Sequence, residues 1–328
     1  MQIIPLLQLA LAAALLTPVG GTPRAPLAPA APLAPAAPLA PQARAGKIQV
    51  VATTPDLAAL AREIGGTAVE VKALAKPTED PHFVDAKPSH IVTLNRADVL
   101  IDGGAELEMG WLPPLVESAR NDKIASGAPG RIVASHGVAM LEVPTTFDRA
   151  KGDVHSLGNP HFLLDPVRVK VVVAEIAKHL AQVDPASAAL FTANRKKFDA
   201  TLDSKLAEWH KTLAPFSGAK IVAYHKDFVY LADQFGLTIV AELEPKPGIA
   251  PSPAHLAKVI GEIKVNRVQV ILVQPYQNRR TAETVARQAG AAVLDVAQQP
   301  GAVQGTDTYF TLMDTIIGTL AKALAEGK

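Results

Sequence analysis

The chain contains no cysteine. This absence excludes disulfides, thiolate metal sites, catalytic thiols and a cysteine that carries a lipid. Any metal site must therefore be built from nitrogen and oxygen ligands. Aromatic residues are scarce at 5%, and the 32 Lys and Arg residues are balanced by 31 Asp and Glu residues without basic clusters. A near-neutral chain of this kind gives no support for a nucleic-acid partner.

Long hydrophobic runs are also missing after the first few residues. The apolar stretch Ile3–Leu16 is too short to cross a bilayer comfortably, but its length is typical of a signal-peptide core. No Lys or Arg precedes it, which is unusual for a signal peptide. We predict a protein that is exported to a bacterial periplasm and is not an integral membrane protein. A wrongly assigned start or a disordered N-terminal tail is the alternative.

An Ala/Pro-rich repeat follows the apolar stretch. A hexapeptide occurs three times over residues 25–42, and its prolines favour an extended linker over a helix. Ala43-Arg44-Ala45 fits the small-x-small rule for cleavage, whereas a cut near Gly20-Gly21 leaves a tether. We therefore expect residues 1–45 to be a signal peptide and linker.

The remaining chain alternates strand-like and helix-like segments. Hydrophobic residues make up 48% of the 328 residues, enough for two domains with sizeable cores. Apolar runs rich in β-branched residues are separated by helical patterns, which favours parallel sheets with crossover helices in an α/β fold. The predicted strands cover residues 47–53, 69–74, 98–103, 220–224, 238–242, 270–273 and 292–296.

A long helical stretch lies between the two halves. Pro166–Leu180 is periodic, and Asp184-Pro185 is a start signal for a second helix that continues to about Leu213 without glycine or an internal proline. Such a helix suits a rigid strut between two lobes. We predict an N-terminal lobe at 46–183, a linking helix at 184–215 and a C-terminal lobe at 216–328.

Three histidines occupy similar positions at the ends of these elements. His82 follows a predicted strand, His161 precedes a helix, and His225 ends an apolar strand. Neutral imidazole is a common ligand for borderline cations such as Zn²⁺, and ligands of α/β folds gather at strand ends. A single histidine in such a place is most often a surface or capping residue. Three of them predict a metal site that the fold assembles from distant segments.

The same segments resemble the metal-binding solute-binding proteins of ABC transporters, of the zinc- and manganese-uptake type. The resemblance covers residues 47–325, and the order and spacing of its motifs are more specific than any one of them. It rests on Asp-Pro-His at 80–82, Arg-Ala-Asp-Val-Leu at 96–100, Asn-Pro-His-Phe-Leu-Leu-Asp-Pro at 159–166, Tyr-His at 224–225, Glu-Pro-Lys-Pro-Gly at 244–248 and Ser-Pro-Ala-His-Leu at 252–256.

The resemblance implies two small parallel-sheet α/β lobes joined by one long helix, with the metal in the cleft between them. By this resemblance His82, His161 and His225 bind the metal. It implies a periplasmic, monomeric protein that is not an enzyme, binds a divalent cation tightly and delivers it to a transporter permease. Imidazoles favour Zn²⁺, and Mn²⁺ is the alternative.

Two departures from the family pattern leave the ligand set open. A histidine-rich loop is absent, because residues 140–158 contain only His155, which we expect to be an exposed loop residue or at best an auxiliary ligand. The usual fourth ligand is a carboxylate after a late strand. Asp295 is the candidate, although the alignment places the expected aspartate nearer Ala297. If Asp295 alternates within the strand, it is equally well explained as an ordinary paired carboxylate. A water molecule is the alternative, and Glu79 and Glu242 are weaker candidates.

Two other functions remain open at this point. Three histidines with an open position also suit a metal-dependent hydrolase. The chain lacks a compact His-Glu-x-x-His motif, and Glu79 near His82 is the one obvious candidate base. A metal-binding surface adhesion protein is the third reading.

Overall fold

The computed structural model describes Gly21 and residues 46–144, 155–246 and 248–326. Apart from Gly21, the predicted signal peptide and linker at 1–45 lie outside the described residues. The described residues from 46 onward belong to one compact unit. Among the described residues, no helix is both long enough and apolar enough to cross a membrane.

The first sheet lies in the N-terminal half and contains four parallel strands in the order β2-β1-β3-β4. Strand β3 reads Val-Leu-Ile-Asp and is buried throughout, as expected for a parallel sheet covered on both faces. The strands are β1 (Ile48–Ala52), β2 (Val69–Ala73), β3 (Val99–Asp102) and β4 (Arg131–Val133), and the helices between them are α1 (Pro55–Gly65), α2 (Pro88–Asn95) and α3 (Leu112–Ala119).

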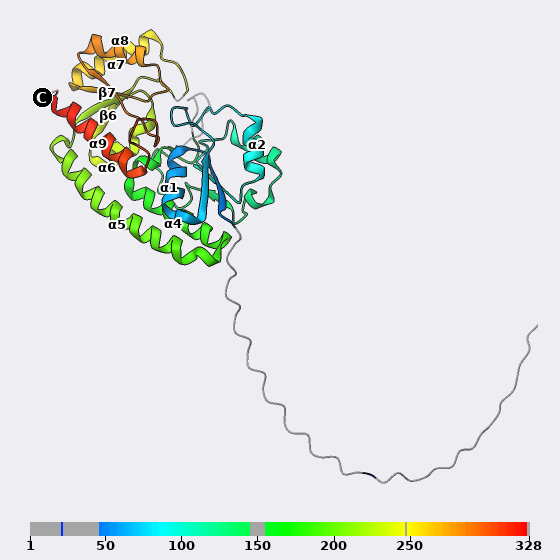
Figure 1. The fold of residues 1–328 in the computed structure, drawn as a ribbon. Coiled ribbons are helices and arrows are strands. Elements are labelled where there is room, and N and C mark those ends of the chain that lie inside the picture. Colours follow the sequence, from blue (N-terminus) through cyan, green and yellow to red (C-terminus); the bar gives the residue numbers. More distant parts are fainter. Residues whose placement is uncertain (1–20, 22–45, 145–154, 247, 327–328) are drawn as a thin grey trace, which may run out of the picture. The chain divides into compact units, whose positions relative to one another are not determined.

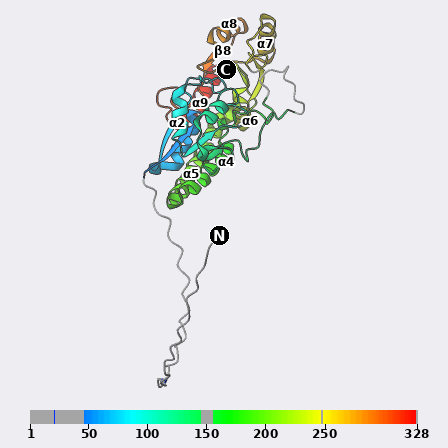
Figure 2. The same cartoon turned by 90° about the vertical axis from the view of Figure 1, so that its right-hand side faces the viewer.

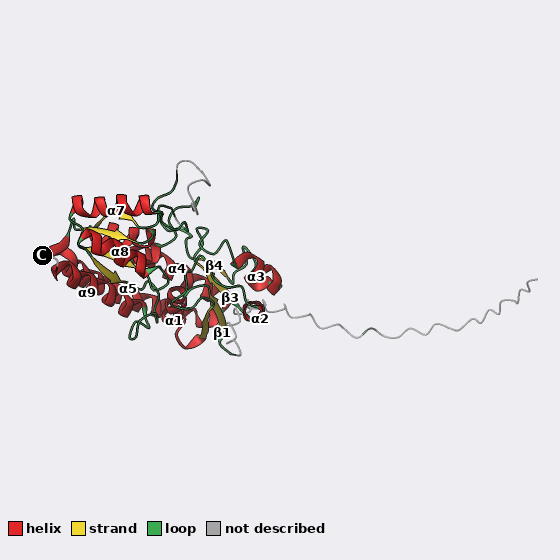
Figure 3. Cartoon of the chain, turned by 90° about the horizontal axis from the view of Figure 1, so that it is seen from above, coloured by secondary structure: helices red, strands yellow, loops and turns green. Residues whose placement is uncertain are grey.

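The second sheet repeats this plan in the C-terminal half. Its four strands are also parallel, in the order β6-β5-β7-β8. Figure 3 shows each group of strands flanked by helices. The elements are β5 (Lys220–Ala223), α6 (Val229–Phe235), β6 (Thr238–Glu242), α7 (Pro253–Asn266), β7 (Val270–Val273), α8 (Arg279–Ala289), β8 (Ala292–Asp295) and α9 (Tyr309–Glu326).

Helices α4 (Pro166–Val183) and α5 (Ala188–Leu213) connect the two sheets. Figure 1 shows α5 running along both halves, and it packs on α1 and α4 of the first half and on α9. The Asp165 carboxylate caps α4 by accepting from the backbone N of Val167 at 2.7 Å. The predicted long helix is therefore present, although its first residues, Pro185–Ser187, form a 3₁₀ turn.

Two parallel-sheet α/β lobes joined by a long helix confirm the predicted fold class. Figures 1 and 2 place α2 of the first lobe well apart from α7 and α8 of the second. We propose that α5 marks the boundary between the lobes, close to the division at 184–215 expected from the sequence.

Direct hydrogen bonds also tie the lobes together. The Tyr230 hydroxyl, on α6, donates to the Asn159 carbonyl at 2.7 Å and accepts from the Leu141 backbone N at 2.9 Å. Arg168 on α4 lies over the Tyr230 ring, 4.7 Å from its centroid. The Asn159 side chain donates to the Lys226 carbonyl at 2.9 Å. These bonds fix the segment that carries His161 against the segment that carries His225.

Candidate metal centre

The fold brings His82, His161 and His225 together. Each offers one ring nitrogen, and the three atoms lie within 4.8 Å of one another. His82 lies in the loop after β2, His161 precedes the turn that leads into α4, and His225 follows β5. The three segments thus meet, and the strand ends of β2 and β5 in the two lobes face one cluster.

His82 is held by its own loop. Asp80 Oδ1 lies 2.9 Å from His82 Nδ1 and accepts from the His82 backbone N at 2.9 Å. Trp111 Nε1 donates to the Pro81 carbonyl at 2.9 Å and anchors the loop to the first lobe. The carboxylate fixes the ring so that Nε2 is the open nitrogen, which is the usual arrangement behind a metal-binding histidine.

His225 has the same kind of support from the second lobe. Its Nδ1 lies 2.8 Å from Glu244 Oε2. Burial opposes protonation of His225, but the nearby carboxylates of Asp227 and Glu244 outweigh it and raise its pKa to about 9. Glu244 belongs to the motif Glu-Pro-Lys-Pro-Gly at 244–248, for which the sequence alone indicated no function. Its structural role is to orient the His225 ring.

His161 is the most deeply buried of the three. Its backbone N donates to Asn159 Oδ1 at 3.0 Å, and its Nε2 lies 3.6 Å from Asp227 Oδ1. Burial, followed by the neighbouring charges of His82 and His225, holds the pKa of His161 well below its usual value. The ring is therefore neutral at pH 7, with a lone pair available for a cation.

Several buried polar atoms at this centre have no partner among the described residues. They are the Nε2 atoms of His82, His155 and His161 and Oδ1 of Asp227. Buried polar atoms without partners cost about 1–3 kcal/mol each, so their concentration in one place calls for an explanation. A divalent cation fits this donor set, because it accepts lone pairs from imidazole nitrogen and carboxylate oxygen alike.

Asp295, the predicted fourth ligand, lies outside the group of three histidines. Its side chain is 61% exposed and pairs with Arg279. Asp295 is the last residue of β8, an edge strand, and the buried residues begin only after it, at Val296. The carboxylate that lies against the cluster is Asp227, which is fully buried two residues after His225.

His155 also differs from its predicted place. It is half-buried and not an exposed loop residue, and its ring centroid lies 5.3 Å from that of His82. Burial and the charge of His82 lower the pKa of His155 to about 4. A single histidine in a loop without secondary structure offers no periodicity, so the sequence contains little that could have placed it.

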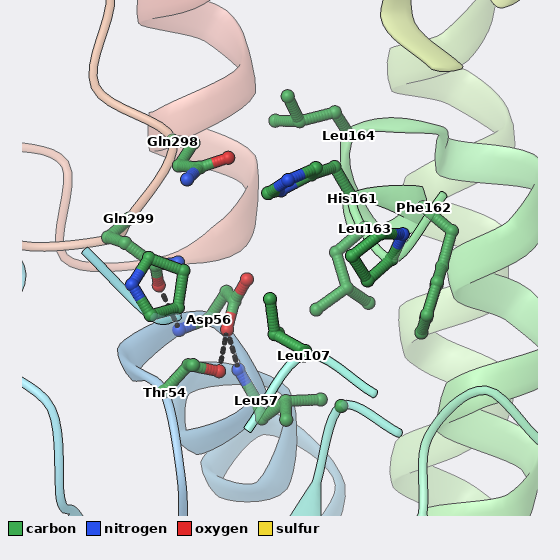
Figure 4. A pocket seen from close by; sticks show the side chains of 13 residues that line it. Thr54, Asp56, Leu57, Leu107, His161, Phe162, Leu163, Leu164, Gln298 and Gln299 are labelled. Carbon is green, nitrogen blue, oxygen red and sulfur yellow. Dashed lines mark hydrogen bonds between the residues drawn. The ribbon is translucent and has the colours of Figure 1, made fainter. Parts of the chain in front are cut away.

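A small cavity of about 20 Å³ is lined by His161 together with Asp56 and Gln299. Figure 4 shows Asp56 on its floor, where the carboxylate accepts hydrogen bonds from Thr54 and the Leu57 backbone. Gln299 accepts from the Asp56 backbone N at 3.1 Å. The cavity has room for about one water molecule. The segment after β8 thus contributes amides here, where a family-type carboxylate was expected.

Comparison with known proteins identifies the family. The family model described as zinc-uptake complex component A, periplasmic (ZnuA) matches residues 50–323. The chain belongs to this family.

Three relatives illustrate its range. The iron-binding protein YfeA of Yersinia pestis is 25% identical over 287 residues, which cover 86% of this chain and 88% of YfeA. A crystal structure of ZnuA superposes with a TM-score of 0.71 at 24% identity, over 84% of this chain and 99% of that one. A manganese-bound periplasmic metal-binding protein from Candidatus Liberibacter asiaticus gives 0.69 at 19% identity, over 85% and 100% of the two chains. The likeness to these solved structures shows the shared fold.

Proposed function

We propose that this protein binds one Zn²⁺ with His82, His161 and His225 in the periplasm and delivers it to the permease of an ABC importer. Its family is one of metal-binding substrate-binding proteins. The choice of zinc, the three ligands, the permease partner, a monomeric state and export through the segment Ile3–Leu16 are parts of the proposal.

The observation that carries the proposal is the set of open nitrogens. A tetrahedral zinc site with Zn–N bonds of about 2.0–2.1 Å places its nitrogens about 3.4 Å apart. The three histidine nitrogens already lie within 4.8 Å of one another. A closure of at most about 1.5 Å is therefore enough to complete three bonds, and the cation relieves the two buried Nε2 atoms that lack partners.

Zinc is favoured over manganese and iron by the ligand type. Relatives of this fold are named for iron, zinc uptake and manganese, so the family by itself leaves the metal open. Imidazole suits Zn²⁺, whereas Mn²⁺ favours carboxylate oxygen. The two carboxylates next to His82 and His225 support the rings from behind, at Nδ1.

A carrier also explains the surrounding carboxylates better than a hydrolase does. A metal hydrolase needs a general base that is free to take a proton from bound water. Asp80 and Glu244 are instead engaged with imidazole nitrogens. Glu79, the candidate base from the sequence, pairs with Lys76 at 3.3 Å. We therefore propose a binding role without turnover.

The test is calorimetric titration of the mature protein with Zn²⁺. We expect one tight site, with affinity at least about tenfold weaker in His82→Ala, His161→Ala and His225→Ala, because each change removes one ligand. His210→Ala is the matched control, since His210 lies on α5 and contacts Gln234. Unchanged affinity in any of the three variants would remove that residue from the site.

A further inference from the structure

We infer that His155 is a fourth imidazole ligand of this centre and that it sets the preference for zinc over manganese. This inference rests on the proposed zinc site. It assigns a function to a loop histidine that the chain carries in place of a histidine-rich segment.

His155 lies next to the three histidines of the cluster. The His155 and His82 ring centroids lie 5.3 Å apart. His82 lies at similar separations from His161 and His225, 5.1 and 5.6 Å. Each of the other three histidines also interacts electrostatically with His155. His155 is outside the group of three whose nitrogens lie within 4.8 Å of one another, so binding requires its ring to come closer to them.

The His155 ring is oriented with one nitrogen toward an oxygen and the other left open. The Ala105 carbonyl lies close enough to the His155 ring to favour a proton on that side. His155 Nε2 is buried without a partner among the described residues, so the nitrogen on that side is Nδ1. His82 and His225 are prepared in the same way, with Nδ1 against Asp80 and Glu244. An oxygen partner at Nδ1 fixes the tautomer and leaves Nε2 open for a metal.

The residue after His155 is held by the first lobe. Ser156, the next residue, donates from its backbone N and its hydroxyl to the Glu106 carboxylate at 2.6 and 2.7 Å. Ala105 and Glu106 adopt φ angles of 49° and 66°, which are unfavourable for residues other than glycine. A strained turn of the first lobe thus places both the carbonyl beside the His155 ring and the carboxylate that holds its neighbour.

Asp227 is the alternative candidate for the fourth metal ligand. Its Oδ1 lies 3.6 Å from His161 Nε2, while its Oδ2 accepts from Gln277 at 2.9 Å. One of its two carboxylate oxygens is thus already held by Gln277. We assign the fourth position to His155 because His155 repeats the ring preparation of His82 and His225.

The chemical consequence is a set of four nitrogens. A site of nitrogen and oxygen ligands generally binds Zn²⁺ more tightly than Mn²⁺. Imidazole ligands increase this difference in affinity, and carboxylate ligands decrease it. His155 therefore acts on selectivity as well as affinity. Its replacement by aspartate should move the site toward manganese.

The experiment measures affinities for Zn²⁺ and Mn²⁺ by competition against a chromophoric chelator, and the absorption spectrum of the Co²⁺-loaded protein. The variants are His155→Ala and His155→Asp. We expect His155→Ala to weaken Zn²⁺ binding by at least about tenfold with little effect on Mn²⁺. We expect His155→Asp to lower the Zn²⁺/Mn²⁺ ratio further and to shift the Co²⁺ bands, because an oxygen replaces a nitrogen.

The matched control is His179→Ala. His179 Nδ1 also contacts a backbone carbonyl, that of Pro129 at 2.8 Å, but it lies on α4 away from the cluster. Wild-type affinity and an unchanged Co²⁺ spectrum in His155→Ala, beside weakened binding in His161→Ala, would overturn the role of His155 and leave the three-histidine site standing. An equally strong loss in Asp227→Asn alone would assign the fourth position to Asp227. A wild-type protein that binds none of the metals would overturn both proposals.

Discussion

Two buried tyrosines offer a matched test of how the lobes are joined. Tyr230 and Tyr309 are 0% and 1% exposed. The Tyr230 hydroxyl makes two hydrogen bonds to the backbone of the first lobe, with the Asn159 carbonyl and the Leu141 N. The Tyr309 hydroxyl is buried with no partner among the described residues. Tyr230→Phe and Tyr309→Phe remove the same atom from opposite environments.

The expected free-energy changes have opposite signs. Phenylalanine at 230 keeps the ring that packs on Phe162 and lies under Arg168, so only the hydroxyl bonds are lost. The stranded Asn159 carbonyl is buried and the Leu141 N is half-buried, which together cost about 2–3 kcal/mol. Tyr309→Phe relieves an unpaired buried hydroxyl, so we expect it to be neutral or to stabilise the protein by about 1 kcal/mol.

Chemical denaturation of the metal-free protein measures both changes. The free energy of unfolding should fall in Tyr230→Phe, and the melting temperature should drop by about 2 °C for each kcal/mol. Equal effects of the two substitutions, or a loss in Tyr230→Phe below about 0.5 kcal/mol, would refute the claim that this hydroxyl joins the lobes.

Four further predictions follow from the same structure. Because metal must displace the proton of His225, Zn²⁺ affinity should rise about tenfold per pH unit up to about pH 9 and then level off. With an ordinary histidine pKa of 6.5, the rise would end near pH 6.5. A flat affinity between pH 6 and 8 would contradict this prediction. Asp295→Ala should change Zn²⁺ affinity less than any substitution at the three histidines, and calorimetry showing an equal loss would make Asp295 a ligand. Metal binding should change the radius of gyration only slightly, because α5 is continuous and hydrogen bonds join the two lobes. Solution scattering that shows a large decrease would refute the interpretation of α5 as a rigid strut. Burial, aided by Asp102, raises the pKa of Glu108 from 4.5 to about 7. The contribution of Glu108 to the free energy of unfolding is therefore largest below pH 4.5 and falls by roughly 3 kcal/mol as the pH rises to about 7. Glu108→Gln should flatten that part of a plot of stability against pH.

Local sequence signals determined the elements of this protein. Buried runs such as Val270–Val273 form strands because apolar β-branched residues suit a parallel sheet covered on both faces. The helix ending at Asn266 begins after Ser252, whose side chain caps it as the Ser-Pro signal indicates. The absence of glycine and internal proline predicted the long α5 helix. Each of these signals acts within a few residues of chain, so a single sequence contains it.

The three histidines were also within reach of the sequence. His82, His161 and His225 each occupy a loop at the end of an element, and parallel strands gather such loops at one edge. The resemblance to a known family added which histidines to choose. Trp111 and Tyr230 position the loops that carry these histidines. In the sequence they look like ordinary core aromatics, because neighbouring residues do not distinguish an aromatic that packs from one that positions a loop.

Only the tertiary structure decided what else reaches the centre. The family resemblance made Asp295 a candidate ligand, but Asp295 is the last residue of the edge strand β8 and its side chain ends in solvent beside Arg279. His155 and Asp227 lie at the cluster because a turn at Ala105 and a buried position after β5 place them there. Strand order and loop path are set by long-range packing, and a spacing along the chain does not record the direction in which a side chain finally points.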